Sequence, residues 1–229
     1  FAPPSRIAVR IAADMVERLS LEPPRLARLT WLGMQAGLLC DLGRFDEALA
    51  SYREQLQLAR TLGFTRDEVR VVADILATLN DMGRAGEALE LGFRALELGT
   101  FDVTWPLRLN LAEARAATGR EHEAIGQIDA ILASDASTVS TRGHALALKL
   151  RLCGASGGLL EQATGLALST DLVPVRVAIA AALASTEPDA AADVVGRLLE
   201  GVSSEEVPAW QEEQWRLLEP YLHSRVIRS

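Results

Sequence analysis

Cysteine is scarce, and its placement excludes a disulfide framework. Cys40 and Cys153 are the only two cysteines, and neither belongs to a CxxC motif. This usage is typical of a cytoplasmic protein with packed thiols. Apolar runs of the ~18 residues that a membrane span needs are missing, as is a signal peptide. The chain opens with Phe1 rather than Met, so we expect a piece of a longer protein.

Positive charge is also scarce. The 23 basic residues face 31 acidic ones, giving a net charge of -8, and only Lys149 is a lysine. A protein that binds nucleic acid directly needs a basic face, so we exclude that class. Aromatic residues make up 5% against 49% hydrophobic residues in total, so the apolar side chains are mostly Ala, Leu and Val. That composition suits helices packed on helices.

Motifs that carry chemistry are missing as well. His122, His144 and His223 are scattered, without an HExxH motif or a Cys/His cluster of metal spacing. The glycine-rich stretch 154–158 lacks the Gly-Lys-Ser/Thr of a phosphate loop and is interpreted as a turn. A Gly-x-Ser-x-Gly nucleophile elbow is absent too. The sequence therefore predicts no catalytic residues, no metal and no cofactor.

A short phrase does recur. It appears as Gly43-Arg-Phe-Asp-Glu-Ala48-Leu49, as Gly83-Arg-Ala-Gly-Glu-Ala88-Leu89 and as Gly119-Arg-Glu-His-Glu-Ala124-Ile125, at spacings of 40 and 36 residues. A degraded fourth copy begins at Gly158, another 39 residues on, and ends at Ala163. Self-similarity at 20–50 residues indicates a solenoid of repeated units.

The phrases resemble the tetratricopeptide repeat, a pair of antiparallel helices joined by a tight turn. The resemblance implies that each glycine ends a first helix in the left-handed region, and that each alanine lies where two helices approach closely. Repeats of about 40 residues are similar to the longer variety in kinesin light chains and in bacterial signalling ATPases that regulate transcription. The match covers roughly residues 29–169.

The expected fold is all-α, a right-handed superhelix of about five to six antiparallel helix pairs in one domain over residues 1–229. Clear repeats occupy about 29–169, and divergent pairs with a C-terminal cap helix occupy 170–225. Spacing predicts an amphipathic helix over 5–20 and a helix from Arg25. Further helices are expected over Val173–Ser185, Asp189–Glu200 and Glu205–Ser224, with capping boxes at Thr65–Glu68 and Ser203–Glu206.

The resemblance also implies where a partner binds, because first helices line the concave groove of such arrays. The positions that hold the family's clamp for chaperone tails are Gly33 and Gly37 here, so that ligand is not expected. The alternative is that a polar side chain on a first helix faces solvent and contacts no ligand. The candidate groove residues are Thr30, Met34, Arg70, Asp74, Asp81, Asn110, Glu113 and Lys149.

The last helix is apolar on more than one side. Trp210, Leu217, Leu218 and Tyr221 approximate one stripe that can seal the end of the solenoid, while Trp215 and Leu222 form a second stripe. A Trp beside a Leu in water marks an interface. We therefore predict an interface that includes Trp210, Trp215 and Leu222, as a homodimer contact or a contact with other domains of a longer polypeptide. The alternative is that both stripes are buried.

The leading functional hypothesis is a non-catalytic scaffold that binds a protein or peptide in its groove, without nucleic acid or membrane. The second is an effector-sensing region of a larger bacterial signalling ATPase or transcription regulator. A third is a helical accessory domain of a larger enzyme.

The repeated alanine gives the first testable prediction. Ala48→Leu or Ala88→Leu should lower the free energy of unfolding by ~1–3 kcal/mol, because overpacking at a close helix crossing forces backbone shifts. Thermal melting measures the effect. An unchanged midpoint would contradict the alignment of the repeats.

Overall fold

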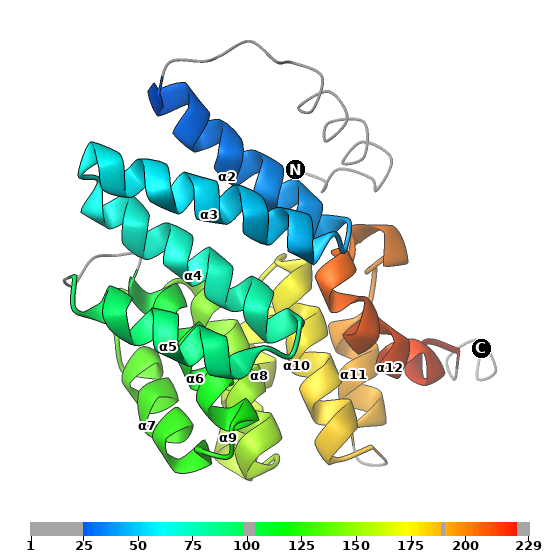
Figure 1. The fold of residues 1–229 in the computed structure, drawn as a ribbon. Helices are drawn as coiled ribbons and strands as arrows, with labels where there is room; N and C mark the ends of the chain where they lie inside the picture. The colour runs from blue at the N-terminus through cyan, green and yellow to red at the C-terminus, as the bar shows by residue number, and fades with distance from the viewer. Residues whose placement is uncertain (1–24, 99–103, 189–190, 224–229) are drawn as a thin grey trace. The chain divides into compact units, whose positions relative to one another are not determined.

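The protein is all-helical in the part that the structure describes. This computed structural model describes residues 25–98, 104–188 and 191–223, and the helix expected over 5–20 lies outside them (Figure 1). The regular elements found there are α2 (Arg25–Asp41), α3 (Phe45–Leu62), α4 (Thr65–Asp81), α5 (Ala85–Leu96), α6 (Thr104–Ala117), α7 (Glu121–Leu132), α8 (Val139–Cys153), α9 (Gly157–Leu168), α10 (Val173–Thr186), α11 (Ala192–Leu198), the 3₁₀ turns η1 (Ser204–Glu206) and η2 (Ala209–Gln211), and α12 (Glu212–His223).

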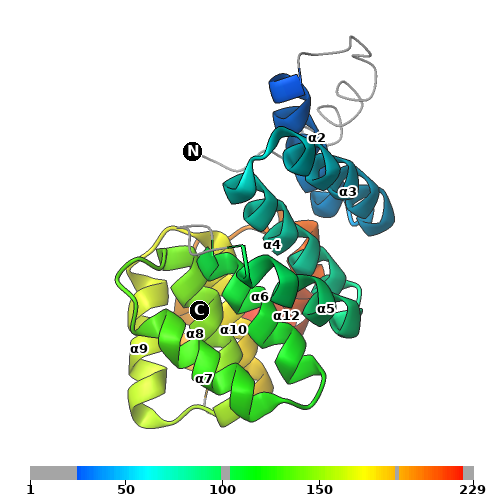
Figure 2. The same ribbon diagram turned by 60° about the vertical axis from the view of Figure 1, so that its left-hand side comes forward.

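The chain forms two compact units, residues 1–120 (unit 1) and 121–229 (unit 2). In unit 1 each helix packs on the next, from α2 through α6, and α4 also packs on α6. Figure 2 shows α2 and α3 side by side as one such pair. In unit 2, α8 packs on α7, α9 and α10, while α10 also holds α11 and α12. The single domain predicted over 1–229 stays a prediction.

The glycines of the three clear repeats end their helices as expected. Gly43 and Gly83 have φ of +71° and Gly119 has φ of +78°, values that favour glycine. At Gly43 the glycine N–H donates to Cys40 O at 2.9 Å, and the next N–H donates to Leu39 O at 2.8 Å. This is the Schellman arrangement, which satisfies carbonyls at a helix end. The same bonds recur at the other two glycines.

The fourth repeat needs a correction. Gly158 lies inside α9, and the glycine that follows α8 is Gly154, with φ of +76°. Its N–H donates to Leu150 O at 2.8 Å, but its ψ of 171° is extended, so the chain leaves α8 without a Schellman turn. The connector 154–156 has three residues, like those after α2, α4 and α6, but its positive-φ glycine comes first instead of second, so the phrase that starts at Gly158 lies wholly inside α9.

The repeated alanines are fully buried. Ala48, Ala88, Ala124 and Ala163 have no exposed surface. Most other matching positions are buried with them, which fits repeats of the tetratricopeptide type: Leu32, Ala36, Leu39, Tyr52, Leu56, Val72, Leu76, Leu79, Ala95, Leu111 and Ala112.

The capping box predicted at Thr65–Glu68 is wrong. Thr65 is already helical, and Phe64 takes the cap position without a side-chain bond. Gly63, at φ +71°, ends α3 so close to this point that the Phe64 N–H donates to Ala59 O at 3.0 Å. The turn therefore satisfies the helix end of α3 and leaves no place for a threonine cap.

The box at Ser203–Glu206 is present, but it caps the short turn η1 rather than the last helix. That helix, α12, begins at Glu212 and not at Glu205. Pro208 explains the delay, since proline lacks an N–H and disfavours a helical residue before it. Val207 is accordingly extended, at φ -84° and ψ 122°. α11 is likewise shorter than the predicted 189–200, whereas α10 agrees with its prediction within one residue.

Gly143 lets α8 approach α10 closely in unit 2. A Cβ added there would lie 2.4 Å from Cγ1 and 2.9 Å from Cγ2 of Val175. Val175 is fully buried and β-branched, so it has little freedom to move aside.

We therefore expect Gly143→Ala to lower the free energy of unfolding by about 1–3 kcal/mol. Gly165→Ala in α9 is the matched control, because a Cβ there meets nothing within 4 Å. It should be neutral or stabilise by about 0.5–1 kcal/mol through helix propensity. Denaturant unfolding measures both variants. Equal effects would contradict the close approach.

Candidate functional site

The candidate site is the first-helix face of unit 1, which we define as the predicted groove side chains of α2, α4 and α6 together with the polar side chains that contact them from the same helices and from α3. Seven of the eight predicted groove residues belong to it: Thr30, Met34, Arg70, Asp74, Asp81, Asn110 and Glu113. The eighth, Lys149, belongs to α8 in unit 2.

Asn110 ties α6 to α4. Its Nδ2 donates to Ala73 O at 2.7 Å, and Asn80 Nδ2 donates back to Asn110 O at 2.9 Å. Among the described residues, the buried Oδ1 of Asn80 has no hydrogen-bond partner. This reciprocal bridge fixes the two first helices against each other. Sequence reasoning missed Asn80, because a single amide beside an aspartate carries no signal of its partner 30 residues away.

Arg70 lies between two carboxylates of its own helix, 3.4 Å from Asp67 Oδ1 and 3.4 Å from Asp74 Oδ2. Lost hydration raises the pKa of Asp74 to about 6, and the charge of Arg70 opposes that rise. Lost hydration, and then the negative charge of Glu113, raise the pKa of Asp81 as well, although this residue stays exposed. Among the predicted groove residues of this face, three are carboxylates and Arg70 is the one guanidinium, although α2, α4 and α6 together carry six acidic and six basic residues.

Three neutral polar groups lie beside these carboxylates. Cys40 Sγ is 3.4 Å from Thr78 Oγ1, and the Thr78 hydroxyl donates to Asp74 O at 2.9 Å. The Cys40 thiol is therefore the donor to Thr78. Desolvation raises the pKa of Cys40, and also that of the neighbouring Tyr52. Both groups stay protonated at neutral pH, so Cys40 is a poor nucleophile. The sequence predicted Cys40 only as a packed thiol.

The α2 part of the face differs from expectation. Met34 is 59% exposed, and the Thr30 hydroxyl donates to Leu26 O of its own helix at 3.4 Å. Gly33, expected in the groove, faces α3 instead. The fully buried Gln55 donates from Nε2 to Leu29 O at 2.9 Å, and a Cβ on Gly33 would lie 2.6 Å from that nitrogen. Position 33 therefore has to be glycine, because the side-chain amide of Gln55 occupies the space that a Cβ would take.

Lys149 makes an ion pair within unit 2. Its Nζ donates to Asp129 Oδ1 at 2.7 Å and so links α8 to α7. Within the described ranges, no group of three His, Cys, Asp or Glu side chains is placed to hold a metal ion. The described helices also include none with the length and apolar character to cross a membrane.

The C-terminal stripes were assigned wrongly. Leu217 is 53% exposed while Leu218 is fully buried. Trp215 and Leu222, which flank Leu218 at helical spacing, pack with Tyr221 against the core of unit 2. The predicted stripe fails because it counts helical spacing from Trp210, which lies in η2, before α12 begins. There the ring centroid of Trp210 is 6.0 Å from that of His144. The interface of Trp210, Trp215 and Leu222 stays a prediction.

Comparison with known proteins defines the fold. No family model and no curated protein matches the sequence. The structure of the Rap conjugation gene regulator of the plasmid pLS20 in complex with the Phr* peptide matches 95% of this chain, with a TM-score of 0.63 and 16% identity. The fold is an all-α helical repeat. This chain spans 59% of the length of the matched regulator chain.

Asp74 predicts a pH dependence of stability. Its pKa rises from 3.8 to about 6 on folding, so the folded state binds more protons between these values. Its contribution to stability is therefore fully present below pH 4 and is lost as the pH rises through 6. Asp74→Asn stays neutral throughout. The difference in melting temperature between the variant and the parent should therefore shift by about 1–3 °C in favour of the variant from pH 4 to pH 7. This expected shift is small because 38% of the Asp74 side chain is exposed.

Asp46→Asn, an exposed change on α3, controls for the loss of one negative charge. If both variants gain equally on the parent, net charge rather than the burial of Asp74 is responsible.

Proposed function

We propose that this chain is a non-catalytic helical-repeat module that binds a peptide on the first-helix face of unit 1. The observation that carries the proposal is the fold, which matches a gene regulator whose structure holds a peptide. A structural likeness at 16% identity does not by itself imply the same ligand. The proposal of a peptide therefore also depends on the side chains of the face.

The carboxylates of the predicted groove positions favour a cationic peptide. Asp41, Asp74, Asp81 and Glu113 supply carboxylates from three helices, and of the six arginines on those helices only Arg70 is a groove candidate. Oppositely charged groups across an interface speed encounter and select the partner. The partner we propose therefore carries Lys or Arg at the positions that meet α4 and α6.

The polar groups of the face suit binding rather than catalysis. A general base or nucleophile needs a partner that activates it. Here the Cys40 thiol donates to a hydroxyl, and the amides of Asn80 and Asn110 are committed to backbone carbonyls. These bonds favour a rigid, preorganised surface, which lowers the ordering cost of binding.

A second candidate function is the effector-sensing region of a larger regulator. Two observations favour it: the matched protein is a gene regulator, and the present chain spans only part of that length. In this version the peptide is the effector, and its binding acts on a domain elsewhere in the polypeptide. A DNA-binding or ATPase domain in the full-length gene would support it.

Selection from a random peptide display library tests the proposal. We expect selected peptides to be enriched in Lys and Arg, and to bind at least ~10-fold more weakly to the double variant Asp74→Asn, Asp81→Asn, since charged hydrogen bonds contribute about 1.5–3 kcal/mol. The matched control, Asp46→Asn with Glu90→Gln, removes two exposed charges from α3 and α5. A failure to select any peptide, or equal weakening by the control, would contradict the proposal.

A further inference from the structure

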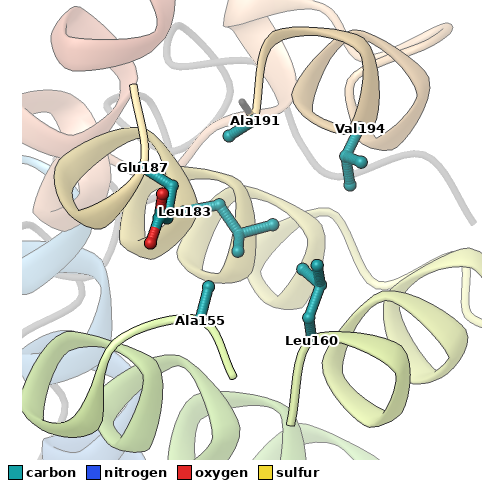
Figure 3. A pocket seen from close by; sticks show the side chains of 6 residues that line it. All are labelled: Ala155, Leu160, Leu183, Glu187, Ala191 and Val194. Atoms are coloured by element: carbon teal, nitrogen blue, oxygen red, sulfur yellow. The ribbon is translucent and has the colours of Figure 1, made fainter. Parts of the chain in front are cut away.

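Unit 2 contains a pocket that the peptide site does not use (Figure 3). Its volume is about 170 Å³, and it lies where the α8–α9 connector, α9, α10 and α11 meet. Its lining consists of five apolar side chains and one carboxylate: Ala155, Leu160, Leu183, Ala191, Val194 and Glu187.

The apolar wall is held by the core. Leu183 and Ala191 are buried members of the core cluster of unit 2, and Ala155, Leu160 and Val194 pack against it. The short side chains of Ala155 and Ala191 leave the space between the helices open. Pockets of this kind, largely apolar with few polar groups, are the usual form of small-molecule sites.

Among the described lining residues, Glu187 is the one with a charge, and its side chain is exposed. Its backbone is fixed, because its N–H donates to Leu183 O at 2.9 Å and its carbonyl accepts from Ala191 N at 2.9 Å. For the carboxylate, the described residues offer neither a hydrogen bond nor an ion pair. Figure 3 shows Glu187 at the Ala155 end of the pocket, whereas Leu160 and Val194 line the other end.

Size and charge together define the ligand. A dry cavity of about 150 Å³ is enough for benzene, so this pocket fits a body of roughly six to eight heavy atoms. The exposed carboxylate at one end of the pocket attracts a cation and repels an anion, whereas a neutral body gains nothing from it. We propose that this pocket binds an ammonium group on a compact apolar body, with the cation at Glu187 and the apolar body against Leu160, Leu183 and Val194. The site does not depend on the proposed peptide site.

Benzylamine, benzyl alcohol and benzoate form a matched set of probes at pH 7. Titration followed by NMR of the Leu and Val methyl groups should show saturable binding of benzylamine at Leu160 and Val194. Benzoate should bind at least tenfold more weakly, and benzyl alcohol about two- to fivefold more weakly, because an ion pair with an exposed carboxylate is weak. Failure of benzylamine to saturate, or equal binding of benzoate, overturns the proposal.

Two variants assign the contacts. Glu187→Gln should weaken benzylamine about two- to fivefold, because its carboxylate is exposed, while Glu161→Gln, an exposed change on α9 outside the pocket, should leave it unchanged. Ala191→Leu should abolish binding by filling the space. If Ala191→Leu fails to fold, the glutamate pair decides alone. Equal weakening by the two glutamate variants contradicts the assignment.

A tetrapeptide with N-terminal leucine, compared with its N-acetylated form, distinguishes a peptide terminus from a free amine as the source of the ammonium. Tighter binding of the free tetrapeptide than of benzylamine assigns the pocket to a chain terminus, and weaker binding assigns it to a small amine. Tighter binding of the acetylated form would contradict the ammonium.

Discussion

The close approach of neighbouring helices is the constraint on which the rest of the molecule depends. Helix backbones come near each other only where side chains are small, and the four repeated alanines occupy such positions with no exposed surface. Gly143 extends the same solution to the α8–α10 crossing, which the repeated phrase does not cover, while Gly33 makes room for the Gln55 amide. Larger side chains there would force the helices apart. The polar side chains of the first-helix face owe their positions to this packing.

Close packing also explains the electrostatics of that face. When α4 lies between α3, α5 and α6, the carboxyl of Asp74 loses part of its hydration and its pKa rises. The same neighbours allow Asn80 and Asn110 to reach each other's helices. A face built in this way combines partly dehydrated carboxylates with a fixed backbone. In unit 2, helices packed in the same way leave a small apolar pocket between them, and the described lining includes one carboxylate.

Features that recur in every repeat could be predicted from the sequence, whereas features set by one residue could not. The three glycine turns, the buried alanines and the all-α fold follow from a phrase that recurs, since each copy supports the others. Thr65 failed as a cap because Gly63 sets the turn before it. The stripe through Trp210 failed because Pro208 delays α12. The candidate groove residues lie on α2, α4, α6 and α8, and their role in a groove stays a prediction. The bonds of Asn110 and the crossing of Gln55 over Gly33 depend on tertiary neighbours, which spacing does not encode.

The central claim is that a peptide binds the first-helix face of unit 1. Titrating the ¹⁵N-labelled chain with a peptide from the display selection tests it most directly, because backbone amide shifts report the contacted helices. The account predicts that the largest shift changes fall on α2, α4 and α6, around Asp74, Asp81 and Glu113. Shift changes concentrated in unit 2, with α4 and α6 unaffected, would contradict it.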